Sequence, residues 1–126
     1  MPDLADTMVD PPPLGGRPAA IRRWFDAAAQ AEIPEYDGTL STARAAGTAY
    51  ARRAKAENTR RAYRAGVRAW CQRHALPCLP AQGSDVVAFL AGERRRNLLV
   101  NTVVLRRAAV RYLHFLAGYP VPTAEA

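Results

Sequence analysis

Residues that would face a core recur at helical spacing in the C-terminal half of the chain, most clearly between residues 59 and 74. At about 100° per residue these side chains fall within about 40° of Tyr63; they are Tyr63, Val67, Trp70 and His74. The opposite side carries only polar residues, namely Glu57, Arg61, Arg64, Arg68 and Gln72. The pattern predicts an amphipathic helix with one buried and one exposed face.

Capping and breaking residues divide the rest of the chain into further helices. Serine, threonine and asparagine accept hydrogen bonds from the free N–H groups of a helix start, whereas glycine and proline end helices. We predict helices at residues 19–32, 43–56, 59–74, 85–96 and 102–117, the last four capped by Ser41 or Thr42, Asn58, Ser84 and Asn101. No stretch alternates with period two, so the sequence predicts an all-α protein, a compact bundle of four to five helices without a sheet.

The first 40 residues form a separate N-terminal tail, and the main domain covers residues 41–118. Five prolines and the Gly15-Gly16 pair lie within residues 1–18, which we therefore predict to be disordered. The short helix that follows carries the neighbouring rings of Trp24 and Phe25. Whether this pair docks on the main domain or on a partner stays open.

The helix at residues 102–117 is apolar almost all round, through Val103, Val104, Leu105, Val110, Leu113, Phe115 and Leu116. A helix of this kind is buried, so we expect it at the centre of the bundle. Six arginines lie near its start, namely Arg94, Arg95, Arg96, Arg106, Arg107 and Arg111. Because a helix N-terminus favours anions, this cluster predicts a phosphate-binding site.

The charge is large and unevenly distributed. The chain has 126 residues, a size suited to one domain, and a formal net charge of +7. Residues 1–50 hold four bases and seven acids, whereas residues 51–126 hold fourteen bases and four acids. The chain lacks the apolar run of about 20 residues that a membrane span needs, and it lacks a secretory signal pattern. We therefore expect a cytoplasmic protein with a basic C-terminal half and no membrane partner.

Arg61, Arg64 and Arg68 form a stripe one turn apart on the exposed face of the helix at 59–74. The planar guanidinium of arginine binds two phosphate or guanine acceptors at once, so the stripe is typical of a helix laid along DNA. The alternative is a solvated face in an arginine-rich chain, since seventeen of the eighteen basic residues are arginine.

Catalytic and metal-binding patterns are weak. Cys71, His74 and Cys78 could supply three zinc ligands, but the sequence places no fourth ligand nearby. His114 is expected to pack under the last helical turn. The chain carries no carboxylate pair, nucleophile motif or phosphate-binding glycine loop. We therefore predict no active site, no metal, no cofactor and no small-molecule substrate.

Several short motifs follow one another in an order typical of one family. They are Glu57-Asn58-Thr59-Arg60-Arg61-Ala62-Tyr63-Arg64, then Leu79-Pro80-Ala81, Asp85-Val86-Val87-Ala88-Phe89-Leu90 and Asn101-Thr102-Val103, and finally His114, Gly118, Pro122 and Thr123. Over residues 41–123 this set resembles the N-terminal core-binding domain of tyrosine recombinases, the phage integrase family. The resemblance implies a SAM-like helical bundle whose second and fourth helices meet the major groove of DNA, with residues 119–126 as the start of an interdomain linker.

The resemblance does not extend to the family's catalytic residues. Its members carry an H-x-x-R motif and a nucleophilic tyrosine in a second domain, but neither His74 nor His114 begins such a motif. None of the five tyrosines matches the nucleophile. We therefore expect a truncated or split recombinase that does not cleave DNA by itself.

The sequence leads to one main hypothesis and two alternatives. The main hypothesis is that this is the DNA-binding half of a site-specific recombinase, whose partners are double-stranded DNA and other recombinase protomers. The candidate DNA-binding residues are Thr59, Arg60, Arg61, Arg64, Arg68, Thr102, Arg106 and Arg111. Arg107 stands where the family has a core leucine, so Arg106 is the better contact. The alternatives are a stand-alone protein that occupies recombinase sites, and a helical protein-interaction module that uses Trp24 and Phe25.

Overall fold

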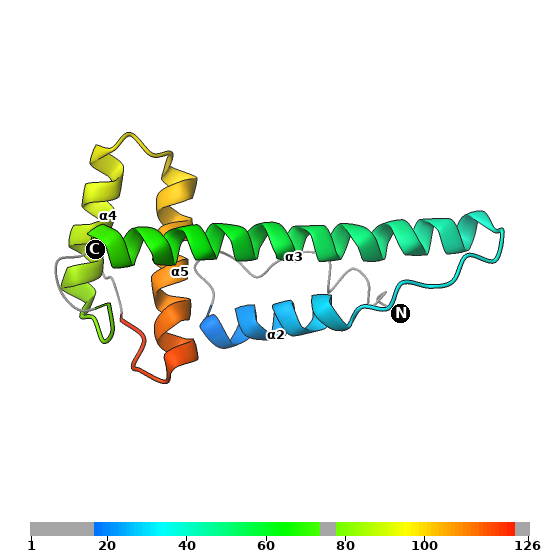
Figure 1. Ribbon diagram of the computed structural model, residues 1–126, viewed down its shortest axis with the longest axis horizontal. Helices are drawn as coiled ribbons and strands as arrows, with labels where there is room; N and C mark the ends of the chain where they lie inside the picture. Colours follow the sequence, from blue (N-terminus) through cyan, green and yellow to red (C-terminus); the bar gives the residue numbers. More distant parts are fainter. Residues whose placement is uncertain (1–16, 74–77, 123–126) are drawn as a thin grey trace. The chain divides into compact units, whose positions relative to one another are not determined.

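The computed structural model describes residues 17–73 and 78–122, and within these ranges it contains four α-helices and no strand. The helices are α2 (Pro18–Gln30), α3 (Leu40–Arg73), α4 (Gly83–Arg95) and α5 (Val100–Ala117) (Figure 1). The prediction of an all-α protein is confirmed. The segment predicted to be disordered lies almost entirely outside the described residues. None of the described helices is both long and apolar enough to cross a membrane.

The chain divides into two compact units, Met1–Arg60 and Arg61–Ala126, and α3 contributes to both. In the first unit, α2 begins with Pro18 at its first position, where the missing N–H costs nothing. Its apolar side is buried as predicted, through Ile21, Trp24, Phe25 and Ala28. The predicted helix at 19–32 is therefore confirmed, with an end at Gln30.

The start of α3 is organised by Asp37 and Thr39. The Thr39 hydroxyl accepts a hydrogen bond from the backbone N–H of Thr42 at 3.3 Å, which is the contact of a helix cap. Asp37 Oδ1 in turn accepts bonds from the Thr39 N–H at 2.9 Å and from the hydroxyls of Thr39 and Thr42 at 2.6 and 2.7 Å. The predicted caps, Ser41 and Thr42, are therefore wrong by two or three residues, because Thr39 already fills this role.

The prediction of two helices at 43–56 and 59–74 is wrong, because α3 runs without a break from Leu40 to Arg73. Asn58 lies inside it and caps nothing. The Thr59 hydroxyl donates to the carbonyl of Lys55 at 3.0 Å, a contact made one turn back along a continuous helix. Asparagine in a helix interior costs less than about 1 kcal/mol relative to alanine, which is too little to end a long helix.

The second unit is built from the last part of α3 and the pair α4 and α5, which run in opposite directions (Figure 1). Its core consists of Ala69 and Trp70 from α3, Val86 and Phe89 from α4, and Val110 from α5. Trp70 is fully buried, and its ring meets the Phe89 ring edge-on at a centroid distance of 5.2 Å. The Trp70 indole N–H donates to the Cys78 carbonyl at 2.9 Å, so the buried polar atom is satisfied.

Gly66 permits the close approach of α3 and α5. A Cβ atom at this position would lie 2.6 Å from Cβ of Ala109 and 3.6 Å from Cα of Arg106. Two small residues therefore meet where the helices come together, and the contact fixes how closely Arg106 approaches α3.

Two predicted helix caps differ from the observed ones. The start of α4 is closed by Gln82 and Asp85, each of whose side chains binds the other's backbone N–H, so Ser84 is not the cap. The N-cap of α5 is Leu99 rather than Asn101. The predicted end of α5 is confirmed, since Gly118 adopts a left-handed conformation with φ of 81° and its N–H bonds back to the last turn.

α5 is buried along one side rather than all round. Ala108, Ala109, Val110 and His114 are buried, whereas Leu116 is 54% exposed. His114 packs under the last turn as predicted, with no exposed surface. Its Nδ1 lies 2.8 Å from the Val110 carbonyl, and its Nε2 accepts a hydrogen bond from the Ala81 N–H at 2.9 Å. The ring therefore carries its proton on Nδ1 and ties α5 to the segment before α4.

Candidate nucleic-acid interface

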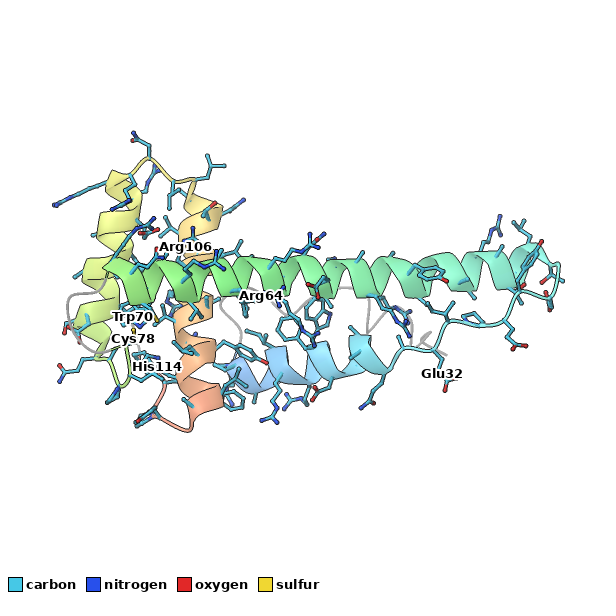
Figure 2. All side chains as sticks on the ribbon, in the orientation of Figure 1. Glu32, Arg64, Trp70, Cys78, Arg106 and His114 are labelled. Carbon is cyan, nitrogen blue, oxygen red and sulfur yellow. The ribbon has the colours of Figure 1, made fainter. Side chains whose placement is uncertain are left out.

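The arginine stripe lies on the exposed side of α3. Arg61, Arg64 and Arg68 are all exposed, whereas Tyr63 and Trp70 on the opposite side are buried (Figure 2 labels Arg64 and Trp70). The amphipathic pattern predicted for this stretch is thus confirmed for these residues; His74 lies outside the described ones. Three cations at spacings of three and four residues gather positive charge on this side of α3.

Two further candidate DNA contacts, Thr59 and Arg60, have surroundings that differ from those of the stripe. Thr59 lies within a continuous helix, so it has no free backbone N–H groups beside it. Arg60 belongs to the first unit, where its guanidinium carbon lies 5.0 Å from the centre of the Phe25 ring, a cation–π contact. Its charge is therefore directed at α2.

The candidate residues on α5 have three different surroundings. Thr102 lies in the first turn, close to the free N–H groups of the helix start. Arg106 is mostly buried, with 16% of its side chain exposed. The Nε atom of Arg111 is buried and has no hydrogen-bond partner among the residues that the structure describes. Desolvation and the neighbouring charge of Arg107 lower the pKa of Arg111, an arrangement that an external anion would relieve.

Glu93 connects three helices and was not predicted as a site residue. It is a charged residue with only 1% of its surface exposed. Its Oε1 accepts a hydrogen bond from Arg73 on α3 at 2.5 Å, and its Oε2 accepts one from Nε of Arg106 on α5 at 3.3 Å. One buried carboxylate thus holds two arginines from neighbouring helices.

The stripe and the Arg73–Glu93–Arg106 cluster occupy different sides of α3. At about 100° per residue, Arg73 is about 180° from Arg64 around the helix axis. The structure thus separates the exposed stripe on α3 from Arg106, which lies at the junction of α3, α4 and α5.

The three arginines before α5 lie at the end of α4, and all are exposed. Arg94 and Arg95 stand in its last turn, where positive charge is favourable. Arg94 also donates to the Leu98 carbonyl at 2.7 Å, across the turn that leads to α5. These contacts give Arg94 a structural role in addition to its charge.

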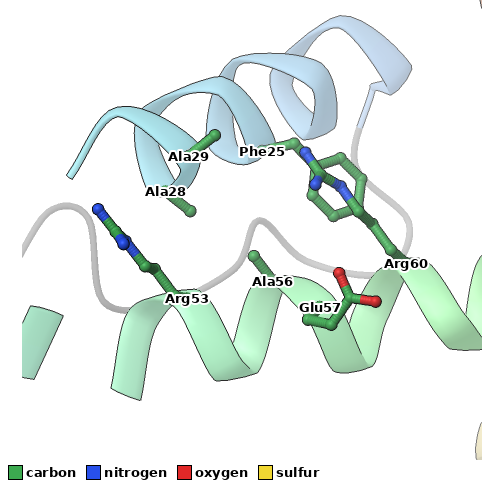
Figure 3. Close-up of a pocket in the computed structure, with 7 residues that line it drawn as sticks. All are labelled: Phe25, Ala28, Ala29, Arg53, Ala56, Glu57 and Arg60. Atoms are coloured by element: carbon green, nitrogen blue, oxygen red, sulfur yellow. The ribbon is translucent and has the colours of Figure 1, made fainter. Parts of the chain in front are cut away.

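A hollow of about 350 Å³ lies in the first unit between α2 and α3 (Figure 3). It is lined by Phe25, Ala28, Ala29, Arg53, Ala56, Glu57 and Arg60. Arg53 donates a hydrogen bond to the Ala31 carbonyl just beyond the end of α2. Arg53 and Arg60, the two arginines that line this hollow, therefore contact α2 or the residue that directly follows it.

The residues considered as zinc ligands do not form a described cluster. His74 lies outside the described residues, Cys71 is exposed and Cys78 is half-buried. Partial desolvation and the neighbouring Cys78 thiol raise the pKa of Cys71 to about 11, and a raised pKa disfavours the thiolate that zinc requires. Within the described residues, no group of three or more potential metal ligands is present.

The structure defines a helical protein in which α3 and α5 carry the candidate arginines on surfaces of different kinds. Residues 48–117 match the family model described as the phage integrase N-terminal SAM-like domain. This match spans more than half of the chain, and the chain belongs to the phage integrase family. Neither a comparison with curated proteins nor one with solved structures gives a match.

Proposed function

We propose that this chain binds double-stranded DNA during site-specific recombination or integration, with the stripe of Arg61, Arg64 and Arg68 as its main contact. The observation that carries the proposal is the exposure of these three arginines on the side of α3 opposite its buried face. The family is consistent with this function, since its integrases act on DNA.

The chemistry of the stripe fits a phosphate backbone. Each arginine can replace a counterion condensed on DNA, and the release of these ions drives binding. The guanidinium fork also fits guanine in the major groove, so the same residues can contribute to sequence recognition. Thr102 and Arg111 on α5 supply further donors.

The proposal extends to partners and activity. We infer that the chain acts beside other recombinase protomers on DNA, and that it does not itself cleave DNA. Its location would be the cytoplasm, in contact with its DNA substrate. The alternative of an interaction module that uses Trp24 and Phe25 is less favoured, because only 9% of the Trp24 surface and 3% of the Phe25 surface are exposed.

The test is the fluorescence anisotropy of a labelled duplex of random sequence, titrated with the chain at several salt concentrations. If about six phosphates are neutralised, the logarithm of the binding constant falls with the logarithm of the salt concentration at a slope near −5. Replacing Arg61, Arg64 and Arg68 by alanine should bring that slope to between about −2 and −3.

A matched control removes the same charge elsewhere. Arg22, Arg23 and Arg44 are exposed residues of the first unit, and their triple alanine variant should change the slope less than the stripe variant does. Equal effects of the two triple variants would mean that net charge alone drives binding. No binding by the folded wild-type chain would overturn the proposal.

A further inference from the structure

The cluster of Arg73, Glu93 and Arg106 contains more charge than the packing of three helices requires. Burying a charge is costly unless it is paired, and a paired cluster is often no more stabilising than apolar residues of similar volume. Glu93 is nevertheless buried at 1% exposure, in line with the core residues Val86 and Phe89 of α4.

The geometry of the two arginines suggests what the carboxylate does. The bond from Arg106 to Glu93 uses Nε, which lies on the inner edge of the guanidinium. The terminal nitrogens Nη1 and Nη2 can therefore still donate to an anion. Arg73 keeps 33% of its side chain exposed and Arg106 keeps 16%, so both reach the surface.

We propose that Glu93 is a positioning residue, which holds Arg73 and Arg106 as a pair that binds one phosphate group of the DNA backbone. The inference rests on the proposed DNA binding and adds a second phosphate contact, made by Arg73 and Arg106 on a different side of α3 from the stripe. The carboxylate fixes both guanidinium groups before DNA arrives, which reduces the side-chain entropy lost on binding. Gly66 supports the arrangement, because its missing side chain lets Arg106 lie close against α3.

The Glu93→Gln variant distinguishes the positioning role from a simple effect of net charge, because the two change the DNA affinity in opposite directions. Replacing Glu93 by glutamine removes one negative charge and so raises the net charge by one, which alone would strengthen DNA binding. Loss of the positioning carboxylate would instead weaken binding, by at least about threefold if part of the contribution of one arginine is lost. The measurement is the anisotropy titration of the random duplex at one fixed salt concentration.

Two comparisons complete the design. Glu35→Gln removes an acid at an exposed position of the first unit, and this control should bind DNA as tightly as the wild type or more tightly. In a background that lacks both arginines, Arg73→Ala with Arg106→Ala, Glu93→Gln should cause little further loss, since both groups that it positions are absent. An equal loss in both backgrounds would point to general unfolding and overturn the inference.

The outcomes distinguish this inference from the proposed function. If the wild-type chain does not bind the duplex, the proposed function fails. If the wild type binds and a folded Glu93→Gln variant binds as well or better, only the positioning role fails.

A measurement on the wild type covers the case in which Glu93→Gln does not fold. The NMR signals of the arginine side chains are followed as duplex is added, with Arg106 assigned from the Arg106→Lys spectrum. The terminal nitrogens of Arg106 should shift while its Nε–H signal stays in place. An Arg106 spectrum unchanged by saturating duplex would overturn the inference.

Discussion

At the scale of single residues, Asp37 illustrates how an exposed carboxylate organises a helix start. Hydrogen bonds from the Thr39 and Thr42 hydroxyls and from the Thr39 N–H lower its pKa from 3.8 to about 2. Because the folded-state pKa lies below the ordinary value, any stability from this contact is present above pH 4 and is lost as the pH falls through about 2.

We predict that an NMR titration of the Asp37 carboxyl carbon gives a pKa of about 2 in the wild type. Thr39→Ala removes the largest hydrogen bonds and should raise this pKa toward 3.8. An unchanged Asp37 pKa in Thr39→Ala would contradict the hydrogen-bonded arrangement.

Two glycines in α3 provide a second prediction at this scale. Gly66→Ala should lower the free energy of unfolding by about 1–3 kcal/mol, because the new Cβ would overlap Ala109 on α5. Gly47→Ala should instead raise it by about 0.5–1 kcal/mol, because nothing lies within 4 Å of the added atom. Urea denaturation of the two variants measures both values, and effects of the same sign would contradict the packing of α3 on α5.

At the scale of whole elements, the sequence predicts a helix best where a strong local signal marks its end. Proline favours the first position of a helix, and glycine favours the left-handed conformation that ends one. The start of α2 at Pro18 and the end of α5 before Gly118 lie where these two residues predict them. Asn58 is a weaker signal, since asparagine is favourable as a cap but tolerated inside a helix. The continuity of α3 through this residue could not be predicted from local propensity.

A substitution at Asn58 tests the continuity of α3 through the sign of its effect. If Asn58 were a helix cap, Asn58→Ala would destabilise the protein by about 1 kcal/mol. Inside an exposed stretch of continuous helix, the same change should stabilise it by about 0.5 kcal/mol. Thermal unfolding followed by circular dichroism measures the difference, and a lowered midpoint would contradict the continuous helix.

Glu93 shows a different limit of sequence reasoning at the candidate site. The exposed stripe could be predicted because periodicity alone separates the two faces of α3. The role of Glu93 depends on arginines from two other helices, which periodicity does not bring together. One signal was available, since Glu93 follows Val86 and Phe89 at spacings of seven and four residues, on the side of α4 that faces the core.

At the scale of the whole molecule, the net charge of +7 affects stability as well as binding. Repulsion among the arginines destabilises the folded chain, and salt screens it. We predict that the midpoint of thermal unfolding rises between low and moderate salt concentration, while DNA affinity falls over the same range. A midpoint that falls with salt would mean that ion pairs such as Arg73–Glu93 outweigh the repulsion.

The division into two units has an optical consequence. The chain contains two tryptophans, Trp24 in the first unit and Trp70 in the second, and both are buried. Each unit therefore carries its own intrinsic fluorophore, whose emission shifts to longer wavelength when water reaches the indole. Replacing either tryptophan by phenylalanine leaves a reporter of the other unit. The fluorescence of the two single-tryptophan chains thus reveals whether the units unfold together or in sequence.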